Sequence, residues 1–179
     1  GPRACYDEGK RLGEGYCYEY FHRYRVCVKI VRIFNTYSAG LQSDDGRVIS
    51  NFVTQALTGR DITIYGDGSQ TRSFCYVDDN IRGLLLTMEK DEANGQIINI
   101  GNTEEYSVLE LAFLVKRLTG SSSKIVHLPL PQDDPKSRRP VIGKANRLLG
   151  WTPQITLEEG LKKTIQAYRS ALLSVGEVI

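Results

Sequence analysis

Short runs rich in β-branched residues alternate with segments of helical periodicity along this chain, and this alternation limits the folds open to it. The strand-like runs are 26–34, 62–65, 72–76, 97–100 and 124–128. The helical segments are 3–24, 47–57, 78–90, 107–118 and an amphipathic segment that opens at 156. Strands and helices mixed in this way predict an α/β fold. A proline-broken, basic linker is expected over 129–140.

A glycine pattern indicates which part of an α/β fold the chain contains. A dinucleotide-binding unit opens with a strand, a G-x-G-x-x-G turn and a helix, which together present backbone amides to a pyrophosphate. No G-x-G-x-x-G occurs in this sequence, and the G-x-G run Gly66-Asp67-Gly68 lies between two strand-like runs and is expected to form a hairpin turn. The amino-terminal dinucleotide-binding strands are therefore expected to be missing.

The composition is that of an ordinary globular protein. The 179 residues are 41% hydrophobic and 25% charged, with a net charge of +2. This weak charge balance gives no reason to expect a nucleic acid or a membrane surface as a partner. No apolar run approaches the roughly 20 residues that span a bilayer. His22 and His127 stand alone, and the four cysteines form no C-x-x-C pair, so no metal site is expected. Buried free thiols are expected instead, which favours a reducing compartment.

An aromatic stripe marks the first helical segment, 3–24. Leu12, Tyr16, Tyr20 and Tyr24 recur every four residues and therefore share one face of the helix. Three glycines in the same segment lower its intrinsic helix propensity. We therefore expect this helix to depend on tertiary or inter-subunit packing.

Local signals also define the later helices. Asp78 is expected to cap the helix over 78–90. Capping boxes of the form S/T-x-x-E stand at 107–110 and 156–159 and are expected to open two further helices. The apolar face of the 78–90 helix is expected to comprise Ile81, Leu84, Leu85 and Met88.

The first candidate for chemistry is a Tyr-x-x-x-Lys pair, Tyr6 and Lys10. Positions i and i+4 share a helix face, so the ammonium can lie near the phenol. A free tyrosine has a pKa of about 10 and is a poor base at neutral pH. A nearby cation favours the phenolate and lowers that pKa toward the working pH. The alternative is a surface stack without a catalytic role.

A series of segments in the same order resembles the UDP-glucuronate decarboxylases (UDP-xylose synthases), which are extended short-chain dehydrogenases/reductases. The segments are 1–11 (GPRACYDEGKR), 32–37 (RIFNTY), 45–48 (DGRV), 68–74 (GSQTRSF), 76–79 (YVDD), 132–135 (QDDP), 138–140 (RRP) and 149–153 (LGWTP). The resemblance covers essentially the whole chain. The first and sixth segments point most narrowly to this family, since related dehydratases and epimerases share many of the others.

The resemblance implies a reaction and a cofactor. In such enzymes, bound NAD oxidises the C4 hydroxyl of UDP-glucuronate, and the resulting ketone lies β to the carboxylate. Carbon dioxide then leaves, and protonation and return of the hydride give UDP-xylose. This makes the enzyme a carboxy-lyase that acts on a UDP-sugar.

The resemblance also implies site residues. Tyr6 would be the base for the C4 hydroxyl, and Lys10 would hold the nicotinamide ribose and lower the tyrosine pKa. Arg138 would face the reacting sugar and orient its carboxylate or assist protonation. The implied catalytic residues are thus Tyr6, Lys10 and Arg138. The implied cofactor-binding residues are Tyr6, Lys10, Thr36 and Arg47. The implied substrate-binding residues are Asn35, Arg47, Arg72 and Arg138.

The implied architecture is the carboxy-terminal half of an NAD-binding Rossmann-like fold with its small substrate-binding subdomain. Residues 1–60 would complete the Rossmann-like domain and carry the Tyr6 helix. Residues 61–179 would be mainly the nucleotide-sugar-binding subdomain, with some segments returning to the Rossmann sheet. A homodimer through the Tyr6 helix is implied, with helices from both subunits forming a bundle. The expected location is cytoplasmic, or the Golgi lumen for an animal protein with an amino-terminal anchor.

Several alternatives stay open from the sequence. Asn35 can serve as a loop-capping amide, and Arg138 with Arg139 can form a solvated basic linker. The enzyme can be a nucleotide-sugar 4,6-dehydratase or 4-epimerase, which would not need a carboxylate at C6. The chain can also be a non-catalytic nucleotide-binding or dimerisation fragment. Without a phosphate-binding turn, the isolated chain is expected to be inactive.

Overall fold

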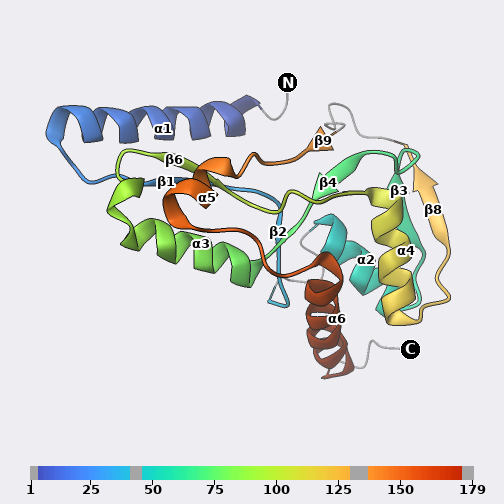
Figure 1. Ribbon diagram of the computed structural model, residues 1–179. Coiled ribbons are helices and arrows are strands. Elements are labelled where there is room, and N and C mark those ends of the chain that lie inside the picture. The colour runs from blue at the N-terminus through green and yellow to red at the C-terminus, as the bar shows by residue number, and fades with distance from the viewer. Residues whose placement is uncertain (1–3, 41–45, 130–136, 175–179) are drawn as a thin grey trace.

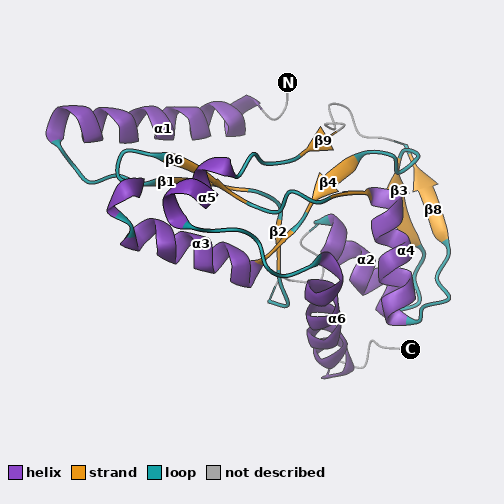
Figure 2. Ribbon diagram, in the orientation of Figure 1, coloured by secondary structure: helices purple, strands orange, loops and turns teal. Residues whose placement is uncertain are grey.

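The computed structural model describes residues 4–40, 46–129 and 137–174. Figures 1 and 2 show its helices arranged around short strands. The helices are α1 (Ala4–Tyr24), α2 (Val48–Leu57), α3 (Val77–Glu89), α4 (Val108–Thr119), α5 (Gly143–Leu149) and α6 (Leu157–Ser174), with a 3-10 helix η1 (Asp91–Ala93). The strands are β1 (Ile30–Ile33), β2 (Thr36–Tyr37), β3 (Ile62–Tyr65), β4 (Thr71–Ser73), β5 (Cys75–Tyr76), β6 (Ile97–Ile100), β7 (Glu105–Ser107), β8 (Ile125–Leu128) and β9 (Ser137–Arg138).

The described strands pair mostly in parallel. The parallel pairs are β1–β6, β2–β5, β3–β8 and β4–β9, and β4 also pairs antiparallel with β7. Parallel neighbours need crossover connections, which here contain helices. In Figure 1, α1 and α3 lie on opposite sides of the β1–β6 pair, while α2 and α4 lie beside β3 and α6 packs against α2 and α4. This arrangement confirms the predicted α/β class.

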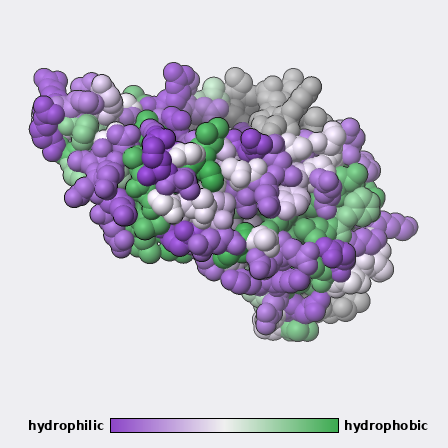
Figure 3. Space-filling view, viewed as in Figure 1, coloured by the Kyte–Doolittle hydropathy of each residue, from purple (hydrophilic) through white to green (hydrophobic). Residues whose placement is uncertain are grey.

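Two hydrophobic clusters form the core. The larger packs α2, α4 and α6 around β3 and includes Phe52, Leu111 and Leu161. The smaller joins β6 and α5 and contains the fully buried Trp151. Tyr37 of β2 belongs to the larger cluster, so the strand next to the candidate site is fixed to the main core. On the face seen in Figure 3, hydrophobic residues lie among hydrophilic ones.

Helix α1 contacts the rest of the fold through few side chains. Arg32 of β1 donates from Nε and Nη2 to the two carboxylate oxygens of Glu14, both at 2.6 Å. Phe21 packs so closely on Gly95 that a Cβ there would lie 2.6 Å from the ring. None of the residues described in α1 is buried. More than half of each side chain in the predicted aromatic stripe is exposed, at Leu12, Tyr16, Tyr20 and Tyr24.

The Glu14–Arg32 pair makes the attachment of α1 sensitive to pH. The hydrogen bond from Arg32 lowers the pKa of Glu14 below its ordinary 4.5. The ion pair therefore stabilises the fold fully at pH values above 4.5, and this stabilisation is lost as the pH falls through the lowered pKa of Glu14. Glu14→Gln should lower the free energy of unfolding by at most about 1 kcal/mol at neutral pH, because the pair is partly exposed, and by less near about pH 3.

Urea unfolding of both proteins at the two pH values checks this expectation. Glu8→Gln is the matched control on the same helix, since it removes only an exposed 3.5 Å contact with Arg11. It should leave stability unchanged at both pH values. An equal loss for Glu14→Gln at both pH values would contradict the assigned role of the pair.

The apolar face predicted for 78–90 is wrong. Helix α3 instead buries Asp79, Asn80, Gly83 and Thr87. The missing side chain of Gly83 allows this opposite face to approach the sheet, because a Cβ there would lie 2.9 Å from Ile100. Leu84 is partly buried, and three predicted face residues are exposed, namely Ile81, Leu85 and Met88.

Other local expectations are also corrected. Asp78 does not cap α3, because the helix begins one residue earlier, at Val77. The turn at 66–68 joins β3 to β4, but these strands pair with different partners, so it is not a hairpin. The described part of the expected linker contains β9, and helix α5 was not predicted. The first strand is shorter than expected. Segment 132–135, residues 1–3 and Asp45 lie outside the described residues.

The capping boxes are confirmed. Ser107 Oγ accepts a hydrogen bond from the Glu110 amide at 3.1 Å, and Glu110 Oε2 accepts one from the Ser107 amide at 2.7 Å. Thr156 and Glu159 make the same reciprocal bonds at 3.3 and 2.9 Å. These bonds satisfy amides that the first turn of a helix otherwise leaves unpaired.

The cysteines are free thiols, as expected, but they are not all buried. Cys75 lies in the core, where burial raises the pKa of its thiol to about 12. Cys5 and Cys27 are exposed because they lie in and just after α1, which is itself exposed. Across the described residues, no helix has the length and apolar character to cross a membrane.

Candidate functional site

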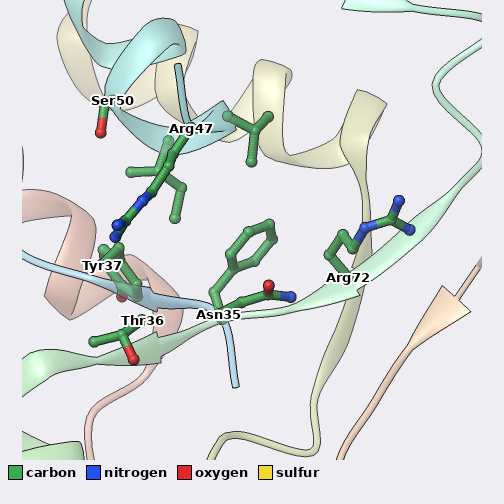
Figure 4. A pocket seen from close by; sticks show the side chains of 9 residues that line it. Asn35, Thr36, Tyr37, Arg47, Ser50 and Arg72 are labelled. Atoms are coloured by element: carbon green, nitrogen blue, oxygen red, sulfur yellow. The ribbon is translucent and has the colours of Figure 1, made fainter. Parts of the chain in front are cut away.

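A cavity of about 210 Å3 lies between β2, β4 and the amino-terminal end of α2. Its described lining residues are Asn35, Thr36, Tyr37, Arg47, Val48, Ile49, Ser50, Arg72 and Phe74. It brings together four predicted site residues from three separate segments, Asn35, Thr36, Arg47 and Arg72. In Figure 4, Arg47 and Arg72 lie on two sides of this space, with Asn35 between them.

Hydrogen bonds hold Asn35 and Thr36 at the cavity. Asn35 Nδ2 donates to the Ser73 carbonyl oxygen at 3.1 Å, and the Asn35 carbonyl accepts from the Cys75 amide at 3.0 Å. Asn80 Nδ2 of α3 donates to Thr36 Oγ1 at 2.7 Å. The Asn35 side-chain amide thus holds the backbone of a neighbouring strand, a role close to the loop-capping amide expected as the alternative. The residue also lines the cavity. Asn80 was not predicted, because no local pattern indicates that an asparagine reaches another strand.

Two arginines give the cavity positive charge. Arg47 stands just before α2 with an extended backbone and makes no side-chain cap to that helix. Arg72 lies in β4, where Nη1 donates to the Thr71 carbonyl oxygen at 2.7 Å. In Figure 4, the Arg47 guanidinium lies toward Tyr37, while that of Arg72 points away from Arg47. A guanidinium binds oxyanions through paired N–H donors, so this arrangement suits an anionic ligand.

Tyr37 and Ser50 also line the cavity, although neither was predicted as a site residue. Burial raises the pKa of the Tyr37 phenol above its ordinary 10, and its hydroxyl donates to the Leu157 carbonyl oxygen at 3.3 Å. Tyr37 is therefore a neutral phenol at physiological pH and cannot act as a base there. Ser50 is fully buried, and its Oγ has no hydrogen-bond partner among the described residues.

The predicted Tyr6–Lys10 pair lies on the open surface of α1. Tyr6 is 68% exposed, and Lys10 Nζ lies 5.4 Å from the centroid of its ring. This is a cation–π stack on the surface, the arrangement expected if the pair has no catalytic role. Neither residue is among those that line the cavity. The described part of the chain therefore does not bring this pair together with the arginines.

Arg138 lies beside Arg72 on the neighbouring strand. The parallel register of β4 and β9 sets Arg72 opposite Arg138, and Ser73 Oγ donates to the Arg138 carbonyl oxygen at 3.2 Å. Residues in register on adjacent strands are about 5 Å apart and project from the same face. Arg138 is exposed, as the solvated-linker alternative expects, but it lies in a paired strand and not in an unpaired linker.

Comparison with known protein families assigns the chain to one of them. Residues 1–101 match the NAD dependent epimerase/dehydratase family. The chain belongs to this family. It has part of the Rossmann-like α/β fold that the resemblance implied, and solved structures, which it matches over about half of their length, support the assignment. A UDP-glucuronic acid 4-epimerase from Bacillus cereus, in complex with UDP-glucuronic acid and NAD, is 31% identical with a TM-score of 0.82. The match covers 89% of this chain and 50% of that one.

Relatives at higher identity narrow the position within the NAD dependent epimerase/dehydratase family. UDP-glucuronic acid decarboxylase 1 of Danio rerio is 52% identical over 96% of this chain and 41% of its own length. UDP-glucuronic acid decarboxylase 5 of Arabidopsis thaliana is 45% identical over 96% of this chain and 50% of its own length. The resemblance to UDP-glucuronate decarboxylases is confirmed. The chain spans about half the length of these relatives.

Because the epimerase/dehydratase family depends on NAD, its members need residues that bind the pyrophosphate and the nicotinamide of this cofactor. Neither G-x-G run has the strand–turn–helix setting that binds a pyrophosphate, because Gly13 and Gly15 lie inside α1 and the turn at 66–68 joins β3 to β4. The described residues therefore offer no pyrophosphate-binding turn. No group of three metal-ligating side chains occurs among the described residues.

Proposed function

We propose that this chain forms the nucleotide-sugar-binding part of an NAD-dependent enzyme that decarboxylates UDP-glucuronate to UDP-xylose. The observation that carries the proposal is the cavity that gathers Asn35, Thr36, Arg47 and Arg72. UDP-glucuronate is anionic at its diphosphate and at its C6 carboxylate, which suits two arginines at one cavity. The identity to decarboxylases from a fish and a plant supports this reaction over epimerisation or dehydration.

The chain's own residues have distinct roles in this proposal. Arg47 and Arg72 bind the nucleotide diphosphate, and Asn35 orients the sugar. Tyr6 removes the proton of the C4 hydroxyl, with Lys10 as the cation that favours its phenolate. Arg138, beside Arg72 in the sheet, orients the C6 carboxylate. NAD, when bound, supplies the acceptor for the C4 hydride and returns that hydride after carbon dioxide has left.

A second candidate is a nucleotide-binding module without activity of its own. The turn at 66–68 favours it, since this turn joins strand β3 to strand β4 and not to a helix, unlike the turn that binds the NAD pyrophosphate. Homodimerisation through α1 is proposed from its exposed aromatic stripe. A cytoplasmic location remains a prediction.

Binding of UDP-glucuronate to the pure chain, measured by isothermal titration calorimetry, tests the proposal. Arg72→Gln should weaken binding by about tenfold or more, the usual consequence of losing a charge-assisted hydrogen bond. Arg60→Gln is the matched control, because the Arg60 side chain is exposed and, among the described residues, hydrogen-bonds only Thr58 Oγ1, at 2.9 Å. Equal affinities for the parent, Arg72→Gln and Arg60→Gln would contradict the proposal.

Mass-spectrometric detection of product separates the two candidates. The chain is incubated with UDP-glucuronate and NAD, and UDP-xylose is sought. Product would support a complete decarboxylase. Binding of UDP-glucuronate without product, in a folded sample, would support the nucleotide-binding module. A shift of UDP-glucuronate to its C4 epimer would instead support the epimerase alternative.

A further inference from the structure

Ser50 has a buried hydroxyl that the fold leaves unsatisfied. The residue is fully buried in α2, and its Oγ has no hydrogen-bond partner among the described residues. A serine inside a helix can bond the carbonyl four residues back, as Thr58 and Thr164 do in this chain. Ser50 makes no such bond. A buried polar group without a partner destabilises a protein, so its presence calls for an explanation.

The position of Ser50 points to that explanation. It lines the cavity as the third residue of α2, and Arg47, three residues before it, is the N-cap of that helix; side chains at these two positions lie close enough to interact. Figure 4 shows both residues at the same end of α2. The other α2 residues that line the cavity, Val48 and Ile49, have apolar side chains. The Ser50 hydroxyl is thus the polar side-chain group that the helix itself offers there.

We propose that Ser50 binds the nucleotide sugar, and that a polar oxygen or N–H of this ligand supplies the hydrogen bond missing from the free protein. The hydroxyl can serve because it both donates and accepts. Its Oγ is shielded from water in the free protein, so binding includes a turn of the side chain between staggered positions. The inference rests on the proposed function and adds a neutral contact to the charged ones of Arg47 and Arg72.

If Ser50 binds the ligand, Ser50→Ala should weaken binding without lowering stability. Ser50→Ala removes an unsatisfied hydroxyl and introduces the strongest helix former. The thermal midpoint should therefore stay the same or rise. Affinity for UDP-glucuronate should fall by about threefold to tenfold, because the bound state loses one neutral hydrogen bond. A serine that served only the fold would show the reverse, a lower midpoint with unchanged affinity.

Two measurements on the 179-residue chain test the assignment, calorimetric titration with UDP-glucuronate and thermal unfolding without ligand. Ser170→Ala is the control, since the Ser170 hydroxyl is exposed and bonds the Gln166 carbonyl of its own helix at 3.1 Å. It should leave affinity unchanged. A lower midpoint for Ser50→Ala would overturn the inference without reference to ligand.

The two proposals fail in different ways. Binding by Ser50→Ala as tight as that of the parent would overturn the Ser50 assignment, while the effect of Arg72→Gln would still stand. A parent chain that binds no UDP-glucuronate would overturn both. Weaker binding by Ser50→Ala at an equal or higher midpoint, with Ser170→Ala like the parent, is the result that supports the inference.

Discussion

Replacing Asp79 with alanine is expected to lower the free energy of unfolding by about 3–5 kcal/mol. The Asp79 side chain is 2% exposed, and its Oδ2 accepts hydrogen bonds from the amides of Gln154 and Ile155 at 2.9 and 2.8 Å. Its Oδ1 accepts a third from Arg82 Nη2 at 2.7 Å. Alanine would leave two amides and a guanidinium without this acceptor. Equilibrium unfolding in urea measures the loss.

Two further variants identify the source of the effect. Asp78→Ala is the control, because that neighbouring carboxylate is more than half exposed and lies 3.4 Å from Lys163. It should change stability by about 0.5 kcal/mol or less. Asp79→Asn keeps the shape and one acceptor oxygen, so its loss should lie between the two. Equal losses of unfolding free energy for Asp79→Ala and Asp78→Ala would show that the buried hydrogen bonds of Asp79 are not the source of the effect.

Local sequence signals predicted what local chemistry determines. The capping boxes at 107–110 and 156–159 formed as expected, because each needs only two side chains three residues apart. The α/β class followed from β-branched runs between helical segments. Gly120 closes α4 with a positive φ of 68°, which glycine adopts without the strain that a Cβ introduces.

Periodicity failed at α3, where long-range contacts decide which face is buried. The apolar residues indicated one face, yet Gly83 allows Ile100 and Trp151 to approach the opposite one. On that face Asp79 binds amides about 75 residues further along the chain. A hydrophobic pattern contains no information about such partners, so it assigned the wrong face.

The candidate site divides in a similar way. The resemblance indicated Asn35, Thr36, Arg47 and Arg72, and the fold gathers all four at one cavity. It could not indicate Ser50, because an unsatisfied hydroxyl becomes visible only when the packing around it is known. The roles assigned to all these residues remain proposals. Tyr6 lies on α1, in which no described residue is buried, so no packing contact places the Tyr6 side chain at the cavity.

Substituting alanine for Gly160 is expected to lower the free energy of unfolding by about 2–3 kcal/mol, although alanine is the better helix former. Gly160 lies in α6 against two aromatic rings. An added Cβ would overlap the Tyr37 hydroxyl and lie 2.8 Å from Tyr37 Cζ and 2.9 Å from Tyr76 Cδ2. Tyr37 cannot retreat freely, because its hydroxyl donates to the Leu157 carbonyl oxygen. Overpacking therefore outweighs helix propensity.

The same substitution should also weaken UDP-glucuronate binding, because Tyr37 lines the cavity. Gly13→Ala is the control, since nothing lies within 4 Å of a Cβ at that position in α1, and it should raise stability by about 0.5–1 kcal/mol. Adding Tyr37→Phe removes the overlapping oxygen, so the double variant should lose less than the sum of the two single losses. Urea unfolding of the four proteins completes this cycle. Strict additivity would show that the clash with the Tyr37 hydroxyl is not the cause, and a Gly160→Ala protein as stable as the parent would show that α6 can move away from Tyr37.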